Sequence, residues 1–325
     1  MIKDLSIWHN LERDNNITTL NEAMLNGRGR HIIHLSETLH EHRYSALADR
    51  IAEKGSVRLV LIAGPSSSGK TTSSKRLALH MRVDGLNPIG ISLDDYFKNR
   101  EDTPKDANGE YDFECLEALD VDFLNKQLSQ LFAGEEIEIP RYNFQTGRRV
   151  FAGDRLKLSE NDVLIMEGIH GLNPALTKII PQSQKFGIFI SVLTPLAIDA
   201  NTTMPSSDYR LLRRIVRDNQ FRGTSAEASI LRWPSVLAGE ARFITPFQSS
   251  ADASFNSALF YEMPMLKCYA EPLLQAIPRT SPAYGEALRL LEMLRTLIAM
   301  TPVETLKIPP TSIIREFIGG SSFSY

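Results

Sequence analysis

A short loop combines glycine, lysine and hydroxyl residues at a spacing that can hold phosphate. Residues 61–75 read LIAGPSSSGKTTSSK and contain the Walker A pattern, Gly64-x-x-x-x-Gly69-Lys70-Thr71. Glycines let the backbone turn and aim N–H groups at phosphate oxygens, and the following helix directs its positive end there too. The lysine reaches the β- and γ-phosphates and the threonine hydroxyl ligates Mg²⁺. We therefore expect nucleotide contacts from Gly64, Pro65, Ser66, Ser67, Ser68, Gly69, Lys70, Thr71 and Thr72.

Two adjacent carboxylates follow the next apolar run, in ISLDDYF. If that run is a strand, Asp94 and Asp95 lie at the carboxyl edge of the sheet, where open α/β sheets bind ligands. A carboxylate there can accept the proton of an attacking hydroxyl during phosphoryl transfer. The alternative role is a helix N-cap, for which aspartate is favoured. Both roles can hold, one for each aspartate.

A basic cluster lies further along, in DYRLLRRIVRDNQFRG. Its arginines at 210, 213, 214 and 217 fall largely on one side of a helix, and Arg222 follows. Such a face can simply be solvated. Beside a phosphate site, however, mobile arginines can close over the phosphates, neutralise charge in the transition state and exclude water. We expect an arginine-rich lid over about residues 208–225, with Arg217 also contacting the nucleotide.

Two other classes of nucleotide-binding protein fit poorly. A switch GTPase carries D-x-x-G after a strand and N-K-x-D for base recognition. Here DANG at Asp106 lies in a polar loop, and NKQL at Asn125 lacks the final aspartate. A motor or transport ATPase usually closes an apolar strand with aspartate or Asp-Glu, whereas VLIMEG ends in a lone Glu167.

The surrounding pattern predicts an α/β fold. Short apolar runs at 57–64, 87–93, 162–168 and 185–193 are typical of strands buried on both faces. Helical patterns at 73–85 and 119–134 separate some of them, which indicates right-handed crossovers and a mainly parallel sheet. We predict a three-layer P-loop NTPase sandwich with helical additions at both ends. The expected parts are a helical segment 1–55, a core 56–270 and a helical extension 271–325.

Composition limits the partners. The 325 residues carry a net charge of −3 and are 42% hydrophobic, so neither nucleic acid nor a membrane is an expected partner. Two distant cysteines form no metal spacing, and the N-terminus lacks a secretion signal, so we expect a cytoplasmic protein with a small-molecule substrate. The apolar stripe of 283–300 leaves a homo-oligomer open.

In chain order, GPSSSGKTT, SLDDYF, YDF, IPRYNFQTGRR, IMEGIHGL and DYRLLRRIVRD resemble the successive motifs of the uridine kinase and phosphoribulokinase branch of P-loop kinases. The resemblance covers about residues 57–225, and the chain is most similar to long bacterial uridine kinase-like nucleoside kinases. In that group the likeness continues through RWPSVLAGE and FQSSADASFNSAL to IIREFIGGSSF, motifs with no obvious chemistry. Longer relatives carry upstream domains that resemble pieces of threonyl-tRNA synthetase, and residues 19–42 resemble the end of that region.

The resemblance implies roles for individual residues. It implies that Asp94 is the catalytic base, that Asp112 holds ribose hydroxyls, and that Tyr142 lies beside the nucleoside. It also implies an acidic residue near Mg²⁺ at Glu167. The implied arginines are Arg210 at the substrate and, at the phosphates, Arg213 and Arg214.

One position departs from the family pattern. Uridine kinases have a base-reading histidine a few residues after the tyrosine, and the matching position in the predicted loop around Tyr142 is Gly147. A glycine cannot supply the buried hydrogen bond that discriminates a base. We expect a kinase that uses ATP and Mg²⁺ to phosphorylate a hydroxyl, most simply a nucleoside 5′-hydroxyl. The alternatives are a phosphosugar or pantothenate-like acceptor, or a non-catalytic ATP-binding regulatory protein.

Overall fold

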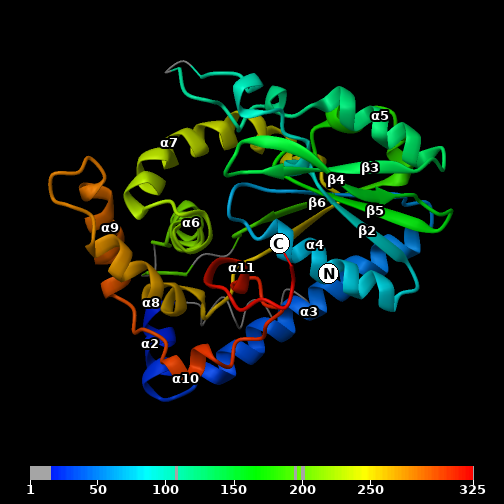
Figure 1. Cartoon of the computed structure of the whole chain (residues 1–325). Coiled ribbons are helices and arrows are strands. Elements are labelled where there is room, and N and C mark those ends of the chain that lie inside the picture. Colours follow the sequence, from blue (N-terminus) through cyan, green and yellow to red (C-terminus); the bar gives the residue numbers. More distant parts are fainter. Residues whose placement is uncertain (1–15, 107–108, 194–195, 199–201, 325) are drawn as a thin grey trace.

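The computed structural model describes residues 16–106, 109–193, 196–198 and 202–324 (Figure 1). Within these residues, five strands form one parallel sheet in the order β2-β5-β1-β6-β7. The four predicted strands are confirmed, and a fifth, β7, lies at the edge beside β6. The strands are β1 (Leu59–Ala63), β2 (Asn87–Ser92), β5 (Asp162–Glu167), β6 (Lys185–Ser191) and β7 (Ala253–Asn256).

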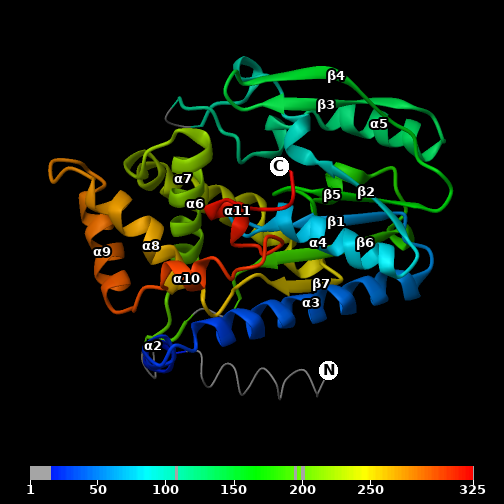
Figure 2. The same ribbon diagram turned by 60° about the horizontal axis from the view of Figure 1, so that its bottom comes forward.

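Helices cover both faces of the sheet, as a three-layer sandwich requires. Side chains of a strand alternate between faces. Accordingly, Val60 and Ile62 of β1 join one hydrophobic cluster while Leu59 and Leu61 join the other. The first cluster includes α3 (Gly29–Lys54) and α4 (Lys70–Val83), and the second includes α5 (Val121–Phe132). Figure 2 shows α3 along one side of the sheet and α5 on the other.

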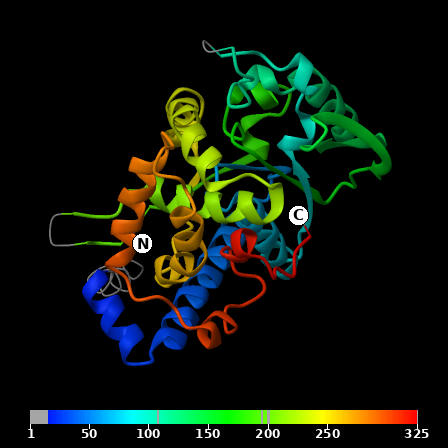
Figure 3. The ribbon, with the colours of Figure 1, turned by 60° about the vertical axis from the view of Figure 1, so that its left-hand side comes forward.

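The helical additions pack into the first cluster (Figure 3). Helix α6 ends at Gly223, which has a left-handed φ of 64°, and the Ser225 side chain then caps α7. The expected boundary after residue 270 falls inside α8. The remaining helices are α2 (Ile17–Leu25), α6 (Ser206–Arg222), α7 (Ala226–Phe243), α8 (Glu262–Gln275), α9 (Tyr284–Arg295), α10 (Pro302–Thr305) and α11 (Arg315–Ile318).

An antiparallel hairpin lies apart from the main sheet, over α5. It consists of β3 (Ile137–Asn143) and β4 (Arg148–Leu156). The prediction of a loop around Tyr142 is wrong, because Tyr142 lies within β3 and pairs with Arg149 of β4. Gly147 forms the turn with a φ of 69°, a conformation that glycine adopts without strain.

Among the described helices, none is both long and apolar enough to cross a lipid bilayer.

Candidate active site

The phosphate loop joins β1 to α4 by a tight backbone path. Gly69 has a left-handed φ of 89° and immediately precedes Lys70, the first residue of α4. Ser67 also has a positive φ, 59°, which is uncommon for a residue with a side chain. Two left-handed residues so close together curl the loop before the helix N-terminus. The loop therefore has the strand–turn–helix context that a Walker A sequence needs.

A cleft of about 1790 Å³ opens beside this loop. Its walls come from five parts of the chain that are far apart in sequence. They are the phosphate loop with α4, the ends of β2 and β5, the hairpin with residues 94–114, helices α6 and α7, and the C-terminal residues 315–324.

The predicted donor-side residues lie together in this cleft. The Lys70 ammonium donates to the Pro65 carbonyl at 3.1 Å, and the Thr71 hydroxyl donates to the Glu167 carboxylate at 3.3 Å. Ser92 donates to the same carboxylate oxygen at 3.1 Å. Burial lowers the pKa of Lys70 although Glu167 and Asp94 lie nearby. Burial, reinforced by Asp94, raises the pKa of Glu167 to about 7.

These groups suit a magnesium nucleotide. Mg²⁺ takes oxygen ligands, keeps several waters and needs one or two carboxylates besides the phosphates. Thr71 and Glu167 supply a hydroxyl and a carboxylate in contact, and Asp94 also lines the cleft. No cluster of three metal-binding side chains of the His, Cys, Asp or Glu type occurs in the described part of the chain. Such a metal would therefore depend on phosphate oxygens and water.

The two adjacent aspartates have different surroundings. Both belong to a 3₁₀ turn, Leu93–Tyr96, directly after β2. The Asp95 carboxylate accepts a hydrogen bond from the Tyr142 backbone N–H at 3.0 Å and lies 3.7 Å from Arg141. Asp95 thus fixes the hairpin to the end of β2. Asp94 lines the cleft near Lys70 and Glu167, where a base would be needed.

The arginines of α6 divide into two sets, of which the first faces the cleft. Arg214 donates to the Ser66 hydroxyl at 3.1 Å and lies 3.3 Å from Asp218. Arg217 contacts Asp218 at 2.7 Å and Arg222 lies 3.6 Å from it. All three arginines line the cleft, and burial lowers the pKa of Arg214.

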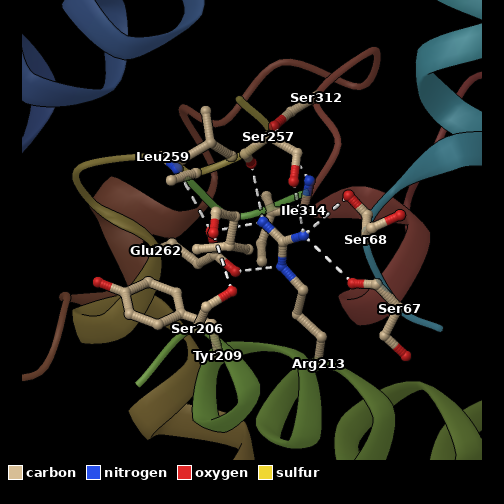
Figure 4. Close-up of polar contacts among 12 residues, drawn as sticks. Ser67, Ser68, Ser206, Tyr209, Arg213, Ser257, Leu259, Glu262, Ser312 and Ile314 are labelled. Carbon is tan, nitrogen blue, oxygen red and sulfur yellow. Dashed lines mark hydrogen bonds and ion pairs between the residues drawn. The ribbon is translucent and has the colours of Figure 1, made fainter. Parts of the chain in front are cut away.

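Arg213 belongs to the second set and lies behind the phosphate loop (Figure 4). The sequence predicted that it reaches phosphate. Its guanidinium instead donates to the backbone carbonyls of Ser67 and Ser68, both at 3.2 Å. The rest of its donors are taken by Ser257 and by Glu262, and both charged side chains are fully buried. A guanidinium so completely enclosed supports the loop from inside.

Arg210 and Asp112, both predicted to bind substrate, also fall outside the cleft lining. Arg210 pairs with Glu240 at 2.7 Å and lies over the Trp233 ring. The Asp112 carboxylate accepts a hydrogen bond from the Glu114 backbone N–H at 3.0 Å, which is a local turn contact. The local backbone thus directs Asp112 to its own turn.

Glu114 lines the cleft and was not singled out from the sequence. It directly follows the YDF motif of residues 111–113, which was the available signal. Burial raises the pKa of Glu114 to about 7, against the attraction of Arg214. Its side chain packs closely on Gly239 of α7, where an added Cβ would lie 2.5 Å from the Glu114 Cβ. The motif RWPSVLAGE thereby supports a cleft residue.

Glu316 of the C-terminal motif is a second residue that sequence reasoning missed. Its carboxylate accepts hydrogen bonds from the Thr72 backbone N–H at 3.1 Å and from the Thr72 hydroxyl at 2.6 Å. The contact joins residues 244 positions apart, so no local pattern could indicate it.

The chain is similar to several known proteins. A uridine kinase from Ureaplasma urealyticum is 28% identical over 197 residues, which are 60% of this chain and 86% of that protein. A uridine kinase from Halobacterium salinarum is 28% identical over 192 residues, covering 59% and 76%. The solved structure of a putative fructose transport system kinase from Silicibacter sp. is 20% identical, with a TM-score of 0.47, covering 65% of this chain and 98% of that one.

A family model extends over more than half of the chain. Residues 59–260 match the Phosphoribulokinase / Uridine kinase family, from the first strand of the sheet to the loop before α8. The matched region includes the phosphate loop, the aspartate pair and helix α6. The chain is therefore a member of the Phosphoribulokinase / Uridine kinase family.

Proposed function

We propose that this protein is an ATP-dependent kinase that phosphorylates a hydroxyl group of a small molecule, most simply the 5′-hydroxyl of a nucleoside. The observation that carries the proposal is the meeting of Lys70, Thr71 and Glu167 with Asp94 in one cleft. Lys70, Thr71 and Glu167 form the set that holds the phosphates and the metal. Asp94 is a carboxylate directly after β2, the strand beside β5. A switch or a sensor needs only the first set.

The residues divide the reaction between them. Loop N–H groups and Lys70 hold the donor phosphates, and Thr71 with Glu167 would hold Mg²⁺, which neutralises phosphate charge when bound. Asp94 accepts the proton of the acceptor hydroxyl while that oxygen forms its bond to the γ-phosphorus. The bond from the γ-phosphorus to the bridging oxygen breaks, and ADP leaves. Arg214 and Arg217 stabilise the charge on the transferring group.

A second acceptor class is favoured by two cations. Arg100 and Arg141 line the part of the cleft formed by the hairpin and residues 94–114, which we call the acceptor half; the phosphate loop and α4 form the donor half. A phosphosugar or a pantothenate-like carboxylate could pair with either arginine, whereas a neutral nucleoside cannot form an ion pair. The turn at Gly147, which packs on Arg100, also offers no side chain to read a base.

A panel of acceptors tests the proposal. ADP release is measured with nucleosides, phosphosugars and pantothenate, beside a reaction without acceptor. ADP release that depends on the acceptor would support the kinase proposal and identify the substrate class. ADP release at the same rate with and without an acceptor would contradict the proposal. Lys70→Ala should lower turnover by several orders of magnitude. The control Lys126→Ala removes an exposed lysine of α5 and should leave turnover unchanged.

A further inference from the structure

The C-terminal segment, residues 309–324, crosses the phosphate loop and is held in place there. Ile313 packs against Gly69 so closely that a Cβ on Gly69 would lie 2.6 Å from its Cγ2 atom. The Ser312 hydroxyl donates to the Glu37 carboxylate at 2.6 Å. Phe317 is fully buried and lies under the Arg213 guanidinium, 5.1 Å from its central carbon. These contacts fix α11 beside the N-terminus of α4.

Glu316 is the residue of α11 that reaches the loop. Thr72, whose N–H and hydroxyl it accepts, is the third residue of α4. Backbone N–H groups of the first helical turn have no acceptor inside the helix and favour anions. In a Walker A loop these N–H groups cradle the α- and β-phosphates. The carboxylate therefore lies in the position that a nucleotide phosphate takes in such a loop.

We infer that the C-terminal segment forms one wall of the donor site and that a nucleotide phosphate exchanges with the Glu316 carboxylate at the Thr72 N–H. The inference rests on the proposed function, because it assumes a nucleotide donor at this loop. Glu316 would then influence the affinity for the donor nucleotide, although it lies outside residues 59–260, which the family model matches. The motif IIREFIGGSSF thereby has a place in the chemistry.

Electrostatics explains why the exchange is competitive. One N–H cannot donate fully to two anions, and two anionic groups side by side repel each other. Glu316 lies close enough to Lys70 to favour its protonated form. The carboxylate thus stabilises the loop before the nucleotide binds and must move away from Thr72 when a phosphate takes its place.

Nucleotide affinity tests the inference. Binding of ADP with Mg²⁺ to the full chain is measured by titration calorimetry for wild type, Glu316→Gln and Glu316→Ala. Point variants are used because removal of the segment would also remove the buried Ile313, Ile314 and Phe317. The control Glu292→Gln makes the same charge change on the exposed side of α9.

The Kd for ADP should fall about tenfold in both Glu316 variants, because each lacks the carboxylate that competes with the phosphate. The fall should be largest in Glu316→Ala, because the glutamine amide still competes through a neutral hydrogen bond, which is about half as strong as a charge-assisted one. Glu292→Gln should match wild type. An unchanged or weaker affinity in folded Glu316 variants overturns the exchange while the kinase proposal stands. If neither wild type nor any folded variant binds ADP, the proposed function itself fails.

Discussion

The phosphate loop and the β3–β4 hairpin line the same cleft but are held in place in different ways. The loop is continuous with a buried central strand and is braced from inside by Arg213, which donates to two of its carbonyls. Among the described residues the hairpin strands pair with each other and not with the main sheet; Ile137 and Tyr142 pack into the second hydrophobic cluster, and the Tyr142 N–H donates to Asp95 after β2. The donor half is therefore built on the central sheet, whereas the acceptor half is a separate hairpin packed against that sheet's second hydrophobic cluster.

This difference separates what a family shares from what distinguishes its members. Phosphate transfer needs one geometry, so the residues that set it lie on the most constrained backbone. Acceptors vary, and a hairpin with exposed side chains such as Phe144 and Phe151 can change without disturbing the sheet. Substitutions in the two halves should accordingly have different signatures.

The largest effect is expected for Asp94, where the two halves meet. Asp94→Asn should lower turnover by about 10²- to 10⁴-fold, the usual contribution of a general base, with ADP binding retained. Asp95→Asn is the matched variant one residue away, and it should mainly raise the KM for the acceptor because it loosens the hairpin. Steady-state kinetics with the best acceptor distinguishes them. Equal losses of turnover in the two variants would contradict the division of roles.

Arg213 and Arg217 provide the next contrast, within one helix. Arg213→Met leaves Glu262 buried without its partner and should lower the free energy of unfolding by about 3–5 kcal/mol. Arg217→Met should change stability less. It should lower turnover by about 10²-fold, because the Arg217 side chain faces the cleft. Urea unfolding and kinetics are measured together. A stable but inactive Arg213→Met protein would restore the phosphate contact that the sequence predicted.

The same contrast explains how far the sequence alone could lead. The meeting of Lys70, Thr71 and Asp94 in one cleft was predictable because each lies at a strand end or in a contiguous motif, where local geometry fixes the side chain. Helical periodicity placed Arg213 and Arg214 on one side of α6, but it could not show that Glu262, 49 residues away, encloses the first of them.

Residues that depend on distant or very local contacts were missed. Glu316 reaches Thr72 across 244 positions, and only the tertiary fold brings them together. Asp112 was assigned to the acceptor, yet a hydrogen bond two residues along its own chain takes its carboxylate. The strand pattern of the core was clear from apolar runs, but every residue of β4 is exposed or half-buried, so β4 gave no such signal.

A smaller effect is expected from Glu114, a half-buried carboxyl of the acceptor half. Its pKa is raised to about 7 in the folded protein, against about 4.3 in an unfolded chain. As the pH rises, Glu114 loses its proton first in the unfolded chain. The contribution of Glu114 to the free energy of unfolding is therefore fully present below about pH 4 and is lost as the pH rises through 7. Taken alone, this carboxyl should shift the thermal unfolding of wild type to lower temperature over this range.

Glu114→Gln should reduce that pH dependence, because the amide does not titrate, whereas Glu167, whose pKa is also raised to about 7, keeps its share. Glu117→Gln, an exposed glutamate three residues further on, should retain the wild-type slope. Thermal unfolding of the three proteins at a series of pH values provides the measurement. If the slope in Glu114→Gln equals that of wild type, Glu114 does not contribute to it.

The smallest effect concerns the hairpin turn. Gly147 and Gly153 both have left-handed backbones, with φ of 69° and 85°. An alanine at either position should therefore lower the free energy of unfolding by about 1–2 kcal/mol. They differ in surroundings: a Cβ at Gly147 would lie 2.7 Å from the Arg100 Nε, whereas a Cβ at Gly153 meets nothing within 4 Å. Gly147→Ala should therefore also displace Arg100 from the acceptor half and raise the acceptor KM several-fold. An equal KM in the two variants would mean that Arg100 does not bind the acceptor, and the case for an anionic substrate would then rest on Arg141 alone.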